Sequence, residues 1–165
     1  MKELKSIREL NENPVRLIAE DWALLSAGNT DKWNTMTVSW GGVGELWGRD
    51  VVFVFVRPQR YTKEFMDSET MFTLSFFDEK YKDALRICGT RSGRNCDKAA
   101  MAGLSVAEDG GAVYPDEARL VVVCRKLSVQ RLDREGFIDK SIEDNYAEND
   151  YHYVYVGEIV KVLEK

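Results

Sequence analysis

A short basic segment, RPQRYT at residues 57 to 62, has the residue types of an anion site. It leaves an apolar run and enters a helical pattern that begins at Thr62. Two arginines followed by an N-cap hydroxyl and the free N–H groups of a helix N-terminus can bind a phosphate. A surface turn with an ordinary N-cap is the alternative. The candidate ligands in this segment are Arg57, Arg60, Tyr61 and Thr62.

A second basic turn follows at residues 89 to 98, with the sequence GTRSGRNCDK. The GxxxxGK(S/T) spacing of a P-loop is absent, so this turn is not predicted to bind phosphates in that way. It could complete an anion site together with the first turn, or it could simply lie in solvent. Its candidate ligands are Ser92, Arg94 and Lys98.

Hydroxyl and apolar side chains alternate in the segment NTMTVSW, from Asn34 to Trp40. A β-strand would send the two kinds to opposite faces. Hydroxyls and strand-end N–H groups suit the edge of an isoalloxazine ring, which needs donors and acceptors beside an apolar plane. A half-exposed strand with its threonines toward solvent is the alternative. The alternation assigns Thr35, Thr37 and Ser39 to one face and Met36, Val38 and Trp40 to the other.

His152 is the only histidine of the chain and precedes a long apolar stretch in NDYHYVYVGEI. Without partners it builds neither a metal site nor a catalytic triad, and we expect no metal. It could donate a hydrogen bond to a carbonyl oxygen or stabilise an anionic flavin, or it could be a structural residue. No paired carboxylates and no GxSxG motif are present. We therefore consider His152 a candidate tuning or positioning group.

The elements that must position these residues are mainly strands. Six segments rich in β-branched and aromatic residues are bounded by Gly, Asn, Asp or Pro, which is typical of strands. One of them, VVFVFV, is continuously apolar and is predicted to be covered on both sides. In the last, Gly157 is predicted to mark a bulge. The predicted strands are residues 16–27, 34–40, 51–56, 72–77, 119–127 and 152–163.

Helical patterns lie between these strands. The segment DEKYKDALRICG has an apolar face, with Asp78 as the expected N-cap and Gly89 as the expected C-cap. Shorter helices are predicted from Thr62 through Met66 and from Asn95 to Gly103. Helices inserted between antiparallel strands favour a β-barrel with helical connections over a doubly wound sheet.

Composition limits the class of protein. The 165 residues suit one domain, residues 1–165, and 44% hydrophobic with 31% charged residues is ordinary globular composition. A net charge of -5 disfavours a nucleic-acid partner. No apolar run is long enough for a membrane span or a secretory signal, so we expect a cytoplasmic protein with no membrane partner. Three cysteines without CxxC spacing indicate neither disulfides nor zinc.

Charge is unevenly distributed along the chain. Basic residues gather at 57–63 and 86–98, whereas residues 133–150 carry seven acids against Arg134 and Lys140. Such segregation suits an anionic small molecule held at one place on an acidic protein. Solvated faces of ordinary helices are the alternative.

In order and spacing, these segments resemble the flavin reductase-like family of FMN-binding split barrels, most closely its flavoredoxin branch. The likeness extends from about Pro14 to Glu158. It implies a mainly β fold, a six-stranded antiparallel Greek-key split barrel with a few short helices. It also implies a homodimer with one FMN per subunit. The segments that carry it are NTMTVSW, GELW, VRPQRYT, FTLSFF, ICGTRSGRNCDK, AGL and DYHYVYVGEI.

The resemblance also implies roles for individual segments. The strand from Met36 to Trp40 would border the flavin ring, and the loop at 57–62 would hold the phosphate. The loop with Ser92 and Lys98 would lie on the phosphate side, and His152 near the ring. Asn95 departs from the family, in which many members have Asp at this place.

The function that follows is an oxidoreductase that passes electrons from NAD(P)H through the flavin to an acceptor. Hydride transfer needs no catalytic acid or base, which agrees with the lack of a recognisable dyad. Two alternatives remain open. One is an FMN-bearing electron carrier that serves a redox protein partner and has no NAD(P)H site of its own, and the other is an interaction module without flavin.

Overall fold

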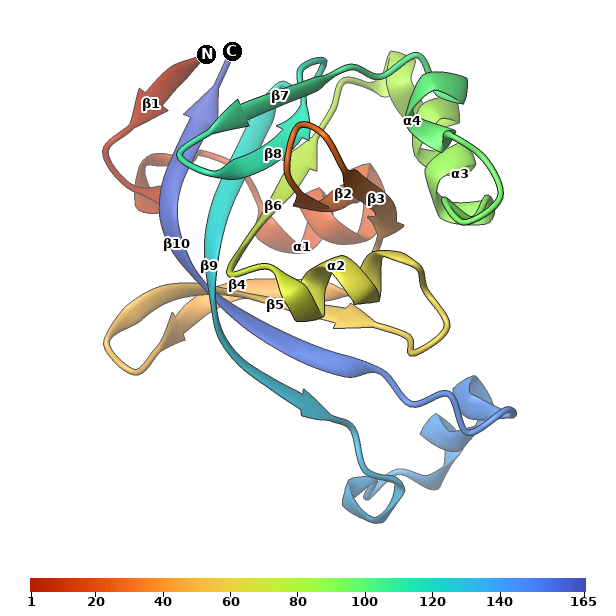
Figure 1. The fold of residues 1–165 in the computed structure, drawn as a ribbon. Coiled ribbons are helices and arrows are strands. Elements are labelled where there is room, and N and C mark those ends of the chain that lie inside the picture. Colours follow the sequence, from red (N-terminus) through yellow and green to blue (C-terminus); the bar gives the residue numbers. More distant parts are fainter.

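An eight-stranded antiparallel sheet forms the body of the computed structural model, which describes all of residues 1–165 (Figure 1). The order of pairing is β3-β2-β6-β9-β10-β5-β4, and β1 pairs with β10. The strands of this sheet are β1 (Lys2–Leu4), β2 (Ala23–Gly28), β3 (Trp33–Val38), β4 (Gly41–Leu46), β5 (Arg49–Val56), β6 (Met71–Phe76), β9 (Leu120–Arg131) and β10 (Tyr153–Glu164). A separate hairpin consists of β7 (Val106–Asp109) and β8 (Ala112–Pro115).

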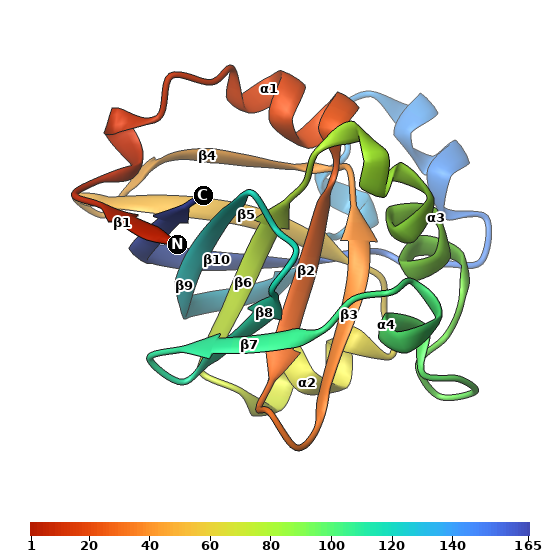
Figure 2. The ribbon, with the colours of Figure 1, turned by 90° about the horizontal axis from the view of Figure 1, so that it is seen from above.

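Short helices connect the strands, and none has the length and apolar character needed to cross a bilayer. Figure 2 shows α3 and α4 beside β3, and α1 along the top of the view, above β4. The helices are α1 (Pro14–Arg16), which continues as a π-helical turn (Leu17–Asp21), α2 (Thr62–Ser68), α3 (Lys82–Thr90) and α4 (Lys98–Met101). Single turns of 3-10 helix occupy Ile7–Glu9, Glu79–Tyr81 and Arg134–Gly136, and a longer one occupies Lys140–Tyr146.

The sheet is split between β3 and β4. These strands end the pairing order at its two sides, although only Ser39 and Trp40 separate them along the chain. The prediction of a mainly β, antiparallel split barrel with a few short helices is confirmed, but the strand count is higher than six. The chain adds β1, β4, β7 and β8 to the strands that the sequence indicated.

The missed strand β4 contains the glycine-rich sequence GGVG, which has low intrinsic strand preference. Its glycines nevertheless fit against β5. A Cβ at Gly41 would lie 2.6 Å from the carbonyl oxygen of Phe53, a distance that no side chain tolerates. Close backbone approach to a continuous partner strand therefore forms β4, where local preference alone would not.

The core lies on both faces of the sheet. In β9, Leu120, Val122 and Cys124 belong to one buried cluster, while Val121 and Val123 belong to a second cluster on the other face. Burial of each such side chain contributes about 1.5 to 3 kcal/mol. The expectation that VVFVFV is covered on both sides is wrong in part, because Phe53 and Phe55 are only half-buried.

Several predicted boundaries are corrected. Residues 16–21 are helical, because the Asn13 side chain caps the N–H groups of Val15 and Arg16 and Pro14 occupies the first turn. Residues 39 and 40 lie beyond the end of β3. Gly157 does mark an irregularity, since the register between β10 and β9 shifts there.

The predicted helix caps also differ. Tyr61, not Thr62, occupies the N-cap position of α2, and Thr62 lies in its first turn. The helix α3 begins at Lys82 after a 3-10 turn and ends past Gly89, which is therefore no C-cap. The last predicted helix shortens to α4, whose N-cap is Asp97.

Candidate functional site

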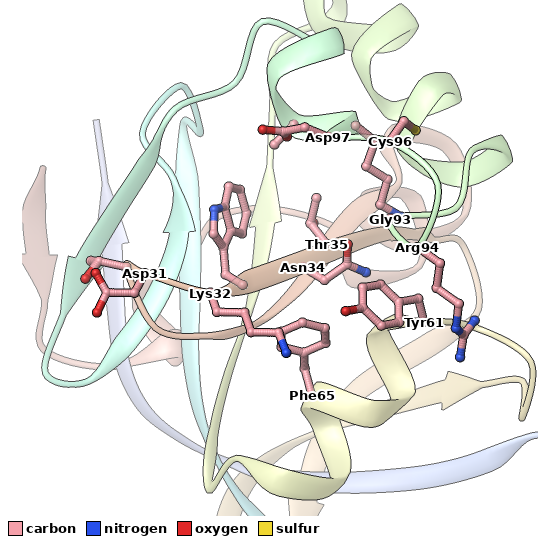
Figure 3. Close-up of a pocket in the computed structure, with 14 residues that line it drawn as sticks. Asp31, Lys32, Asn34, Thr35, Tyr61, Phe65, Gly93, Arg94, Cys96 and Asp97 are labelled. Carbon is pink, nitrogen blue, oxygen red and sulfur yellow. The ribbon is translucent and has the colours of Figure 1, made fainter.

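Two hollows follow one another along β3. The larger hollow has a volume of about 470 Å³ and lies against the first half of the strand, and Figure 3 shows its polar lining. The smaller hollow, of about 220 Å³, begins where the larger ends. The larger is lined by residues 30–35, Tyr61, Phe65, Gly93, Arg94 and residues 96–99. The smaller is lined by residues 36–40, Phe55, Arg57, Arg60 and His152.

Tight packing joins the two basic loops beside the larger hollow. A Cβ at Gly93 would collide with Asn34 Oδ1 and would lie 3.0 Å from Tyr61 Cδ1, so only glycine fits. Asn34 in turn donates from Nδ2 to Thr62 Oγ1 at 2.7 Å. The guanidinium of Arg94 lies 4.9 Å from the centre of the Tyr61 ring. The structure thus brings together the two basic segments, for which the sequence left open either one shared anion site or exposure of the second segment to solvent.

A half-buried arginine and a buried lysine lie where the hollows meet. Arg60 Nη1 donates to the carbonyl oxygen of Gly89 at 2.8 Å, while its Nη2 is buried without any partner. Lys98 is 4% exposed and donates from Nζ to the carbonyl oxygens of Cys88, at 3.1 Å, and Arg91, at 3.4 Å. No carboxylate pairs with either residue.

The electrostatics of this pair call for an anion. Burial, reinforced by the charge of Arg60, lowers the pKa of Lys98 to about 8. Burial also lowers the pKa of Arg60. Keeping a cation away from water without a counter-charge is unfavourable, and carbonyl oxygens compensate only in part. Arg60 lines the smaller hollow and Lys98 lines the larger one, so a negatively charged ligand bound there would relieve both costs.

The other predicted cations are already paired. Arg57 forms an ion pair with Asp150 and donates from Nη2 to the carbonyl oxygen of Asn145 at 2.9 Å. Arg94 pairs with Glu64. The expected free helix N-terminus is only partly available, because the N–H groups of residues 63 and 64 already donate to the preceding turn. Any phosphate grip therefore depends on side chains more than on α2.

The predicted face of three hydroxyls is only partly available. Thr35 is buried, where its hydroxyl accepts from Ser26 and donates to the carbonyl oxygen of Leu25 at 3.2 Å. Thr37 donates to the carbonyl oxygen of Leu85. Only Ser39 keeps a free hydroxyl at the smaller hollow, because the neighbouring elements use the other two.

His152 lies within an aromatic group at the smaller hollow. Its Nδ1 is 2.9 Å from the hydroxyl oxygen of Tyr146, and its ring centre is 5.3 Å from that of Trp40 and 6.3 Å from that of Phe55. Burial, followed by the charge of Arg57, lowers the pKa of His152 to about 4. The ring is therefore a neutral donor and acceptor at pH 7.

Three neighbours of the site had no clear sequence signal. Phe55 belongs to a strand that was expected to be wholly buried, and Tyr146 and Asp150 lie in the acidic segment that sequence reasoning treated only as charge. The available sign of a role at the site was Tyr146, because an aromatic residue is unusual in so polar a segment. Of the predicted residues, Ser92 and Thr62 lie outside both hollows.

The cysteines are separate and chemically unlike. Cys88 is fully buried, and burial raises its pKa to about 11. Cys124 is buried in the core, and Cys96 lines the larger hollow. All three are free thiols. No group of three or more His, Cys, Asp and Glu side chains is arranged to hold a metal ion.

Residues 15–165 match the sequence profile of the family described as "Flavin reductase like domain". The chain belongs to this family. A comparison with curated protein sequences finds no significant match.

Solved structures share the fold of the family. Flavoredoxin from Methanosarcina acetivorans superposes with a TM-score of 0.69 at 21% identity, over 100% of this chain and 76% of that one. The FMN-binding protein from Thermus thermophilus with bound p-hydroxybenzaldehyde gives 0.68 at 20% identity, over 100% and 82%. The NADH:FAD oxidoreductase from Streptomyces globisporus C-1027, in complex with NAD and FAD fragments, gives 0.65 at 14% identity, over 88% and 74%.

Proposed function

We propose that this protein binds FMN at the two hollows along β3 and passes electrons from NAD(P)H through the flavin to an acceptor. The observation that carries the proposal is the buried, unpartnered Nη2 of Arg60 beside the buried ammonium of Lys98. A terminal phosphate is the part of FMN that would satisfy both. Family membership and the FMN-binding protein among the similar structures support this choice of ligand.

The rest of the site fits a flavin ring. The smaller hollow combines the apolar surfaces of Phe55 and Trp40 with the free hydroxyl of Ser39 and the neutral ring of His152. These are the apolar walls and the few polar groups that a planar heterocycle with polar edges requires. We propose that the ring lies here and that the ribityl chain leads toward Arg60 and Lys98.

In the reaction, bound FMN supplies the chemistry of hydride acceptance and electron transfer. The protein's own residues orient the flavin, exclude water from it and hold its charged phosphate end. Trp40, 49% exposed in the free protein, would be covered by the ring that it flanks. Arg60 and Lys98 would fix the position of the phosphate end, and so the place of the ring along β3.

The phosphate assignment is tested with a pair of flavins. Arg60→Ala should weaken FMN binding about 10- to 150-fold, the loss expected for a hydrogen bond to a charged group. Riboflavin, which lacks the phosphate, should bind wild type and variant equally. The control is Arg86→Ala, which removes an exposed arginine of α3 that pairs with Asp83. Equal FMN affinity for wild type and Arg60→Ala would refute the assignment.

The electron donor is tested separately by stopped-flow absorbance. The FMN-loaded protein should lose its oxidised flavin band rapidly when mixed with NADH or NADPH. A flavin that is reduced by dithionite but by neither nicotinamide would identify an electron carrier instead. A protein that stays colourless after incubation with FMN would leave only the interaction module.

We also propose that the protein forms a homodimer, as its family resemblance implies. In Figure 1, the paired ends of β9 and β10 project well beyond the barrel and carry residues 132–151. Val129 and Ile138, on this projection, are exposed apolar side chains. Sedimentation equilibrium should give twice the monomer mass of 18.9 kDa.

A further inference from the structure

The hydroxyl of Tyr146 and the ring of His152 form a buried pair at the margin of the smaller hollow, which His152 lines. Tyr146 is 6% exposed, and its oxygen lies 2.9 Å from His152 Nδ1. This is the only side-chain hydrogen bond of either residue. The direction of the bond determines which nitrogen of His152 carries the proton, because a neutral imidazole has one donor and one acceptor.

Counting donors and acceptors decides the direction. If Nδ1–H donated to the phenol oxygen, the phenol proton would have no acceptor in the chain, and an unsatisfied buried donor is costly. If the phenol donates to Nδ1, its proton is satisfied and the imidazole proton moves to Nε2. Burial raises the pKa of Tyr146, which keeps the phenol protonated and able to donate.

We propose that Tyr146 is a positioning residue that holds the proton of His152 on Nε2, so that the ring presents an N–H donor to the smaller hollow. Nε2 has no partner within the chain, and it is not among the buried unpaired atoms, so it is reachable from the hollow that His152 lines. The inference rests on the proposed function for its ligand, which must offer a carbonyl oxygen or an oxyanion at this place.

The surroundings hold Tyr146 firmly. Its ring stacks on Tyr151, with centres 4.8 Å apart, and on Phe137, with centres 5.8 Å apart. The guanidinium of Arg57 lies 5.2 Å from the same ring. The charges near His152 are Arg57, which disfavours an imidazolium, and Asp150, which favours one. Burial has the larger effect on the pKa of His152 and makes the neutral ring the stable form, while these two opposite charges partly cancel.

A single histidine allows a direct test by NMR. In ligand-free protein labelled with ¹⁵N at histidine, long-range ¹H–¹⁵N correlations at pH 7 should show an unprotonated Nδ1 and a protonated Nε2. A protonated Nδ1 in the wild type would overturn the proposal without any variant. Because this measurement needs no flavin, it remains informative if FMN proves not to be the ligand.

The matched variants are Tyr146→Phe and Tyr151→Phe. The first removes the donor and keeps the stacked ring, so the two ¹⁵N signals should move toward each other and the pKa of His152 should rise. The second removes a hydroxyl that makes no hydrogen bond, and should change neither. Identical spectra and an identical pKa for wild type and Tyr146→Phe would overturn the proposal.

Kinetics then test the use of the donor. In FMN-loaded protein, Tyr146→Phe should slow reduction by the nicotinamide about tenfold, since an oriented donor would be lost, while FMN affinity changes less than twofold. Tyr151→Phe should reduce at the wild-type rate. An unchanged rate in Tyr146→Phe would contradict a role for the pair in the reaction. The FMN titrations of Arg60→Ala would still test the proposed function independently.

Discussion

The ammonium of Lys98 gives the site a dependence on pH that the phosphate proposal makes specific. Its pKa of about 8 in the free protein means that it loses its proton in mildly alkaline solution. FMN affinity should therefore fall above about pH 8, by up to about tenfold per pH unit, because a neutral amine no longer attracts the phosphate. Riboflavin affinity should stay level over the same range.

The control for this prediction is Lys98→Arg, which keeps its charge throughout. Fluorescence titrations from pH 7 to 10 should give a flat FMN profile for this variant, whatever its absolute affinity. A wild-type profile as flat as that of Lys98→Arg would mean that the charge of Lys98 does not contribute to phosphate binding.

His152 makes a second, independent contribution to pH dependence. Its pKa of about 4 in the folded protein lies below the ordinary value of 6.5. Between these two pH values the unfolded chain therefore binds a proton on His152 that the folded chain does not bind. Its contribution to stability is present above pH 6.5 and is lost as the pH falls toward 4.

This effect is measured by urea unfolding of wild type and His152→Asn at pH 7 and pH 5. Between pH 7 and pH 5, the free energy of unfolding of the wild type should fall by about 1 kcal/mol more than that of the variant, since the ring keeps part of its hydration. Parallel losses in the two proteins would show that His152 titrates alike in the folded and unfolded states.

At the scale of residues, the sequence indicated the place of the site better than its pairings. Arg57 and Arg60 look equivalent in RPQRYT, yet the structure pairs the first with Asp150 and leaves a nitrogen of the second free. Asp150 lies at the other end of the chain from this loop. Such a difference depends on the tertiary fold, and no local pattern contains it.

At the scale of elements, side-chain type predicted the inner strands and failed where backbone geometry decides. The runs rich in β-branched and aromatic residues correctly predict β5, β6, β9 and β10, because burial and local preference agree there. β4 was missed because glycines bring it close to Phe53. The apolar residues at 16–21 alone predict a strand, but the cap at Asn13 starts a helix there.

Gly157 provides a prediction at this scale. A Cβ there would collide with the ring of Phe72 and lie 3.0 Å from the Cβ of Cys124. Gly157→Ala should therefore lower the free energy of unfolding by about 1 to 3 kcal/mol through overpacking. Gly136→Ala is the matched control, since nothing lies within 4 Å of its added methyl. Urea denaturation that shows equal stability for both variants would disprove the clash.

At the scale of the whole molecule, the site depends on segments far apart in the chain. The projecting residues 132–151 reach the smaller hollow through Tyr146 and through the ion pair of Asp150 with Arg57 (Figure 1). The position of residues 132–151 is therefore set by a few contacts. Loss of one of these contacts should increase local opening throughout the segment.

Asp150→Asn tests this coupling, because it removes the charge and keeps the size of the side chain. Hydrogen exchange in residues 140–150 should become about fivefold faster, as expected when a partly exposed ion pair is lost. Glu143→Gln is the control, since it breaks the pair with Arg134 that lies within the segment. Exchange as slow as in the wild type would mean that Arg57 does not anchor the segment.

The pairing of β5 with β10 joins Val51 to Glu158 and Val56 to Tyr153. On the ribosome, β5 emerges long before this neighbour is made. Until then the apolar strand VVFVFV has β4 on one side and an open edge on the other, which favours association with other nascent chains. Translation in an extract depleted of holdase chaperones should therefore yield aggregates, and supplying the chaperones should restore the folded product.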